Sequence, residues 1–160
     1  MTREARSGAG LASGRGYTPD MAAVRARVCV FAKPPRPGRV KTRLVSALGE
    51  EGAAELAGAF LRDTLAQVQA LPWADPVVAT TGDLGALAPA GVETWLQGEG
   101  DLGQRIERVM RRALADREQA VALGADTPGL PVRLLEQGRA ALTAGHQIRG
   151  RWWRNAAAVR

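Results

Sequence analysis

Hydrophobic and polar positions follow two different periods along the chain, and the changes of period predict its elements. Short apolar runs bounded by Pro, Gly or charged residues are typical of buried strands, and four such runs occur at 27–32, 76–80, 92–96 and 120–124. In the segments that follow the strands, apolar residues recur every three or four positions, which predicts amphipathic helices at 50–70, 101–115 and 131–143. The second of these helices is expected to pack inward through Leu102, Ile106, Val109, Met110 and Ala113.

The order of these strands and helices predicts the fold class. Alternation with such connections favours a mostly parallel sheet with helices on its faces. We therefore expect one α/β domain at 25–144, with a three-layer α/β/α, Rossmann-like arrangement. Ligands of such sheets bind at the carboxyl ends of the strands. Three unusual segments each directly follow a predicted strand, at 33–43, 97–103 and 125–131, so the sequence predicts that they meet at one edge of the sheet.

Composition excludes several classes of protein. A chain of 160 residues with 46% hydrophobic content fits one domain with its own core. It contains no run of 18 apolar residues that would span a membrane, and the first 20 residues lack the apolar segment of a secretory signal. Residues 1–24 are interpreted as a disordered leader, with Met21 as an alternative start. The single cysteine, Cys29, fits a cytoplasmic location and is interpreted as a buried structural thiol.

The formal net charge of +6 is unevenly distributed along the chain. Residues 21–49 contain seven Lys or Arg and no acid, and residues 137–160 contain five Arg and no acid. A basic segment attracts anions, which include a nucleotide phosphate, a nucleic-acid backbone and an acidic membrane. Charge alone does not choose among these three partners.

The first unusual segment reads FAKPPRPGRVKTRL and places five cations within eleven residues: Lys33, Arg36, Arg39, Lys41 and Arg43. Its prolines stiffen the loop, and Gly38 permits a positive φ or a close approach of the backbone to a ligand. A loop of this kind after the first strand suits a di- or triphosphate held by Lys, Arg and backbone N–H groups. It is not a Walker A loop, because the spacing GxxxxGK[ST] is absent. The alternative is a solvated basic loop.

The other two segments carry weaker signals when each is taken alone. In QGEGDLGQR, residues 97–105, the glycines permit a close approach to a base, sugar or phosphate, whereas Asp101 equally suits a simple helix N-cap. In LGADTPGLP, residues 123–131, a strand ends and leaves Asp126 at the sheet edge. Mg²⁺ is commonly held by one or two carboxylates plus substrate phosphates, which favours a metal site at Asp126. The alternative is an Asp-Thr-Pro turn without a ligand.

The three segments together, in this order and after these strands, resemble the DUF2064 family over about residues 27–142. Proteins of that family carry labels such as glycosyltransferase or radical-SAM/selenodomain-associated transferase. They are similar to the GT-A nucleotide-diphospho-sugar transferase fold and, more distantly, to phospholactate and molybdenum-cofactor guanylyltransferases. The resemblance therefore implies a transferase of the nucleotide-diphospho-sugar type, of which this chain would supply the N-terminal part.

The resemblance also implies roles for particular residues. The nucleotide-phosphate loop corresponds to Lys33, Gly38, Arg39, Lys41, Thr42 and Arg43. The second segment, expected near the nucleotide or donor, corresponds to Gln97, Gly100, Asp101, Gly103 and Arg105. Asp126 matches the aspartate expected to hold Mg²⁺ or Mn²⁺, with Thr127 and Pro128 shaping the turn. No catalytic residue is assigned.

The chain departs from the family at its C-terminal end. Where the family continues into a GPAxDGGYxLxG-like segment, residues 145–160 form a divergent basic tail, GHQIRGRWWRNAAAVR, without any acid. We hypothesise a truncated or frameshifted product that binds nucleotide weakly and catalyses little. A DGG-like segment in another frame of the encoding DNA would support this hypothesis, and its absence from every frame would refute it.

Three functions from two classes follow from the sequence. The first is a glycosyltransferase-like enzyme that uses a nucleotide-diphosphate sugar donor and a divalent metal, with an unassigned acceptor. The second is a nucleotidyltransferase that resembles a guanylyltransferase and releases pyrophosphate. The third is a basic nucleic-acid-binding module, which is disfavoured because the cations lie in one stiff loop without aromatic residues.

Overall fold

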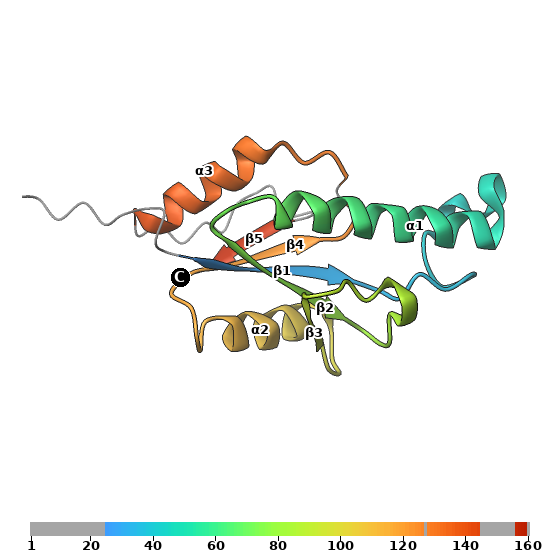
Figure 1. Ribbon diagram of the computed structural model, residues 1–160. Helices are drawn as coiled ribbons and strands as arrows, with labels where there is room; N and C mark the ends of the chain where they lie inside the picture. Colours follow the sequence, from blue (N-terminus) through green and yellow to red (C-terminus); the bar gives the residue numbers. More distant parts are fainter. Residues whose placement is uncertain (1–24, 127, 145–155, 160) are drawn as a thin grey trace, which may run out of the picture.

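The computed structural model describes residues 25–126, 128–144 and 156–159 (Figure 1). The predicted leader, Thr127 and most of the predicted basic tail lie outside the described residues. The strands are β1 (Ala26–Ala32), β2 (Ala74–Thr80), β3 (Glu93–Leu96), β4 (Ala120–Gly124) and β5 (Ala156–Val159). The helices are α1 (Val45–Gln69), α2 (Leu102–Ala113) and α3 (Val132–Thr143), with 3₁₀ turns η1 (Thr42–Leu44) and η2 (Gly85–Leu87).

The strands form one sheet in the order β3-β2-β1-β4-β5. The first four strands pair in parallel, and β5 pairs antiparallel with β4. This arrangement confirms the predicted α/β class with a mostly parallel sheet. The strand β5 was not predicted, because its sequence Ala-Ala-Ala-Val lacks the β-branched and aromatic enrichment of a strand.

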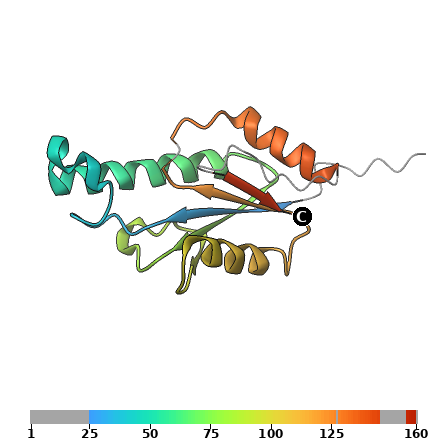
Figure 2. The ribbon, with the colours of Figure 1, turned by 180° about the vertical axis from the view of Figure 1, so that it is seen from behind.

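Helices cover both faces of the sheet, as Figures 1 and 2 show, with α1 and α3 on one face and α2 on the other. The first face buries an apolar cluster that includes Leu61, Leu65, Val68, Leu135 and Leu142. The second face buries a smaller cluster that includes Cys29, Val77, Val109, Met110 and Ala113. The prediction that Leu102 packs inward is wrong: it lies in the first turn of α2 and is 64% exposed.

The start of α1 differs from the prediction in an informative way. The helix begins at Val45, yet Gly49 has φ 73° and ψ 172°, which interrupts the helix. The regular part of α1 therefore begins at Glu50, where the sequence predicted it. Because φ is positive at this break, the position favours glycine.

Cys29 lies in the buried core of the sheet. Burial raises the pKa of the Cys29 thiol to about 12, so the side chain stays protonated and unreactive at neutral pH. This confirms the interpretation of Cys29 as a buried structural thiol. Among the helices of the described ranges, none is both long and apolar enough to cross a membrane.

Candidate functional site

The topology creates a crevice at the carboxyl end of β1. β2 and β3 lie on one side of this strand, and β4 and β5 lie on the other side. The order in which the chain adds strands therefore reverses direction at β1. In open α/β sheets such a switch point is the usual ligand site. A cleft of about 500 Å³ lies here, and its walls come from the loop after β1, from the segment between β3 and α2, and from the end of β4.

The cleft brings together seven of the sequence-predicted site residues: Lys33, Arg39, Lys41, Thr42, Gln97, Arg105 and Asp126. The other five do not line it: Gly38, Arg43, Gly100, Asp101 and Gly103. The charged side chains of its wall are four cations and one carboxylate. The cleft is therefore strongly electropositive and suits an anionic ligand.

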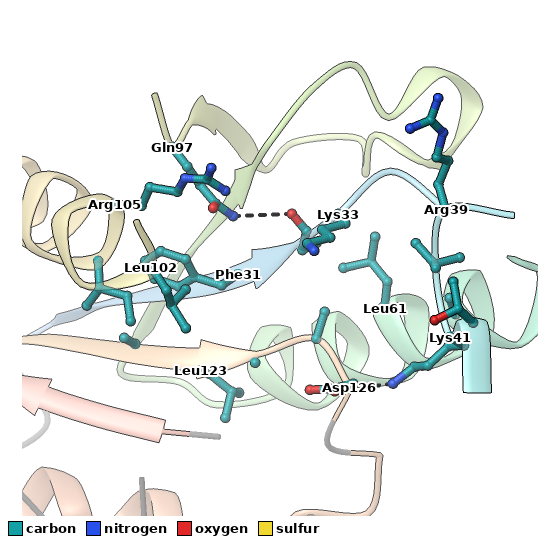
Figure 3. Close-up of a pocket in the computed structure, with 18 residues that line it drawn as sticks. Phe31, Lys33, Arg39, Lys41, Leu61, Gln97, Leu102, Arg105, Leu123 and Asp126 are labelled. Atoms are coloured by element: carbon teal, nitrogen blue, oxygen red, sulfur yellow. Dashed lines mark hydrogen bonds and ion pairs between the residues drawn. The ribbon is translucent and has the colours of Figure 1, made fainter. Parts of the chain in front are cut away.

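Lys41 and Asp126 lie next to each other at one end of the cleft, where Figure 3 joins them by a dashed line. The Nζ atom of Lys41 donates to Oδ2 of Asp126 at 3.2 Å. The side chains are 25% and 54% exposed, so solvent reaches the pair. Two segments that are 85 residues apart in the chain thus meet through opposite charges, as their placement after β1 and β4 predicted.

The backbone before Asp126 is held from two sides. The N–H of Ala125 donates to the carbonyl of Phe31 at 3.0 Å, which extends the pairing of β1 and β4. The hydroxyl of Thr64, on α1, donates to the carbonyl of Ala125 at 3.4 Å. Thr64 is 1% exposed and was not among the predicted site residues. In the sequence, Thr64 could have been noticed as a polar residue within the apolar stripe of α1, beside Leu61 and Leu65.

Lys41 itself has an unusual backbone. Its φ of 47° and ψ of 38° lie in the left-handed region, and no other non-glycine residue of the described ranges has a positive φ. Its ammonium lies 5.3 Å from the centre of the Phe60 ring on α1, within cation–π range. Strained residues of this kind persist where the surrounding structure holds them, often at ligand sites.

Gly38 shapes the loop and does not line the cleft. Its φ is 70°, and a Cβ at this position would lie 3.1 Å from Oε1 of Glu50. The N–H of Arg39 donates to the carbonyl of Arg36 at 3.0 Å and closes the turn around it. The positive φ expected at Gly38 is thus present, and the loop packs against the start of the regular part of α1.

Gln97 joins the ends of two strands. Its side chain is buried, and Nε2 donates to the carbonyls of Ala32 at 3.2 Å and Ala79 at 2.8 Å. Both N–H groups of the amide are therefore occupied, and only Oε1 remains to accept a hydrogen bond from a ligand. The side-chain amide of Gln97 can therefore meet a hydrogen-bond donor of a ligand, such as a base or sugar group, but it has no free N–H for a phosphate oxygen.

Most of the second predicted segment forms the start of α2. The carboxylate of Asp101 accepts from the N–H of Gln104 at 2.9 Å, and the Gln104 side chain accepts from the N–H of Asp101 at 3.0 Å. This is a capping box, so the simpler of the two interpretations of Asp101 accounts for its position. Gly100 has φ 109°, and a Cβ there would overlap the Gln104 amide oxygen.

Arg105 is the member of this segment whose charge reaches the cleft. It lies beside Gln97 in Figure 3, at the other end of the cleft from Asp126. Its Nε is buried and has no hydrogen-bond partner among the residues that the structure describes. A buried donor without a partner costs about 1–3 kcal/mol, which a polar ligand at this end would relieve.

The acidic side chain of the site could hold a metal ion only if a bound phosphate supplied further ligands to that ion. The described residues contain no group of three or more His, Cys, Asp or Glu side chains that would hold an ion by themselves. Asp126 is the single acid that lines the cleft among the residues that the structure describes. One carboxylate plus phosphate oxygens is a common way for a protein to hold Mg²⁺, so the residues present fit a metal that arrives with a phosphate ligand.

Comparison with known proteins places the chain among relatives. A solved structure from Desulfovibrio desulfuricans G20, described as a "putative nucleotide-diphospho-sugar transferase", is similar with a TM-score of 0.68 and 30% sequence identity. The match covers 75% of this chain and 55% of that chain, so the present chain spans about half the length of this relative. No protein of curated function matches significantly.

A family profile gives the assignment. Residues 64–151 match the family described as "Uncharacterized protein conserved in bacteria (DUF2064)". The match includes the second and third sequence segments and ends within the predicted tail, whereas the basic loop precedes it. Because this match covers more than half of the chain and agrees with the structural likeness, the chain belongs to the DUF2064 family.

Proposed function

We propose that this chain binds the diphosphate of a nucleotide-diphospho-sugar donor in the cleft between β1 and β4, as part of a glycosyltransferase-like enzyme. The observation that carries the proposal is the charge of that cleft. Lys33, Arg39, Lys41 and Arg105 surround it, and within the described ranges Asp126 is its single acid. A diphosphate neutralises these cations in a partly enclosed site, where the interaction is stronger than in bulk water.

The binding residues have separate tasks in this proposal. The flexible cations of the loop after β1 neutralise the phosphates, and the strand ends fix where the loop begins. At the other end of the cleft, the Oε1 of Gln97 accepts from an N–H or hydroxyl group of the nucleoside, and apolar Phe31 and Ile106 line the wall. The acceptor molecule and the base of the donor are not assigned.

A divalent ion, Mg²⁺ or Mn²⁺, belongs to the proposal as a cofactor held by Asp126. When bound, it would stabilise the negative charge on a departing nucleoside diphosphate. The chain contributes an oriented carboxylate for this purpose, because Phe31 and Thr64 hold the backbone of Ala125 on both sides. Catalysis would thus depend on position and electrostatics.

Calorimetric titration with UDP and with GDP, each with and without Mg²⁺, tests this function. We expect at least one of them to bind, and more tightly with Mg²⁺. Failure of UDP, GDP and inorganic pyrophosphate all to bind would refute the proposal, and binding of DNA with a steep salt dependence would favour the nucleic-acid alternative. Once a donor and an acceptor are identified, the released product separates the two reactions. Release of nucleoside diphosphate indicates sugar transfer, whereas release of pyrophosphate indicates nucleotidyl transfer.

A further inference from the structure

We propose that Lys41 acts as a built-in counterion that occupies Asp126 until a diphosphate binds, so that the cleft takes a metal ion only together with its phosphate ligand. This inference rests on the proposed function and adds an order of binding to it. It concerns a residue that the sequence assigned only to phosphate contact. The structure gives that residue a second partner, the carboxylate expected to hold the metal.

Three contacts place the Lys41 ammonium at this position. The left-handed backbone of Lys41 turns its side chain into the cleft, the Phe60 ring lies 5.3 Å from Nζ, and Oδ2 of Asp126 accepts from it at 3.2 Å. Arg39 and Lys33 line the same cleft, but neither has an ion pair with Asp126 among the described residues. Lys41 is therefore the cation that a metal must displace.

Electrostatics sets the direction of the effect. A divalent ion at Asp126 would lie beside the Lys41 ammonium, and like charges at this distance repel. A diphosphate removes the conflict, because its negative oxygens attract the ammonium and also supply ligands to the metal. Since the ion pair is open to solvent, little free energy holds it closed, and the phosphate can draw Lys41 away.

Thermodynamic linkage gives the observable consequence. If a diphosphate favours metal binding, the metal must favour diphosphate binding by the same factor. The protein alone should bind a divalent ion poorly. Removal of the Lys41 charge should make metal binding tighter in the absence of phosphate, although it makes phosphate binding weaker.

Binding of Mn²⁺ without any phosphate, followed by electron paramagnetic resonance, tests the inference on the full chain. We expect Lys41→Met to bind Mn²⁺ about tenfold more tightly than the wild type, and Lys41→Gln to behave similarly. Methionine retains a long side chain and adds no backbone freedom at the left-handed position. Arg36→Met is the matched control: it removes one charge from the same loop, outside the cleft, and should change Mn²⁺ affinity less than about twofold.

Two outcomes would overturn the counterion role. One is an unchanged Mn²⁺ affinity in both Lys41 variants while circular dichroism shows them folded. The other is an equal gain in Arg36→Met, which would point to the overall charge of the loop. A thermal-shift assay with inorganic pyrophosphate, with and without Mg²⁺, reports separately on the proposed function. If pyrophosphate shifts the wild type while the Lys41 variants bind Mn²⁺ no more tightly, the function stands and the counterion role fails.

Discussion

Asp126→Ala is expected to abolish the dependence of nucleoside diphosphate binding on Mg²⁺. The affinity measured by calorimetry in Mg²⁺ should fall to the metal-free value, a loss of roughly 100-fold or about 2.8 kcal/mol. The physical reason is that no other carboxylate of the described part of the chain lines the cleft, so no described acid can replace Asp126. Metal-free binding should change little or become tighter, because a negative charge beside the phosphates is removed.

The fold should survive this substitution. The Asp126 side chain is 54% exposed, and its ion pair with Lys41 is worth about 0–1 kcal/mol. Asp63→Ala removes an acid from the exposed face of α1 and serves as the control, with no effect on Mg²⁺ dependence. If Asp126→Ala retained a full response to Mg²⁺, the metal assignment would be wrong.

Arg27→Met is expected to lower the free energy of unfolding by about 3 kcal/mol. Arg27 lies at the opposite end of β1 from the cleft, and its side chain is 5% exposed. Its guanidinium pairs with Asp75 at 3.1 Å, Glu93 at 3.2 Å and Asp116 at 2.6 Å, and it lies over Trp95. Without it, Asp75 and Asp116 would keep only their ion pairs with Arg117, and Glu93 would lose its contact with a cation.

Chemical denaturation measures this loss, with Arg111→Met as the comparison. Arg111 also pairs with an acid, Glu107, but its side chain is 79% exposed, so its loss should cost less than about 1 kcal/mol. Equal destabilisation by the two substitutions would show that burial of Arg27 adds nothing.

The effect of Arg27→Met should shrink in acid. The hydrogen bond from Arg27 holds the pKa of Asp116 below its ordinary value of 3.8. A carboxyl group whose pKa is lowered by folding stabilises the folded state above its ordinary pKa, and this stabilisation is lost as the pH falls toward the lowered value. The difference between wild type and variant should therefore narrow below about pH 4.

The sequence predicted which segments surround the site better than it predicted the contacts of individual side chains. Strand and helix periods, together with the switch-point rule, placed the segments around Lys41 and Asp126 at one edge, and the structure joins them there. The pattern did not reveal that Gln97 gives both its N–H groups to strand carbonyls, because this depends on the spacing of β1 and β2 in the sheet. Such a contact has no local signature.

Other differences have similar causes. Leu102 fits the apolar period of α2, but it lies in the first turn of the helix, where it lines the cleft and stays 64% exposed. Thr64 interrupts the apolar stripe of α1, and only the folded chain shows its hydroxyl reaching Ala125. The capping role of Asp101 was one of two open interpretations, and the reciprocal contact with Gln104 decides where its carboxylate is used.

In the proposed function, a diphosphate and a metal ion bind together between the loop after β1 and the end of β4. Paramagnetic broadening of backbone amide signals by Mn²⁺, in the presence of UDP or GDP, locates the ion directly. We expect the amide signals of Gly124, Ala125 and Asp126 and those of Lys41 and Thr42 to broaden first. Preferential broadening around Asp75, Glu93 and Asp116, at the other end of the sheet, would contradict it.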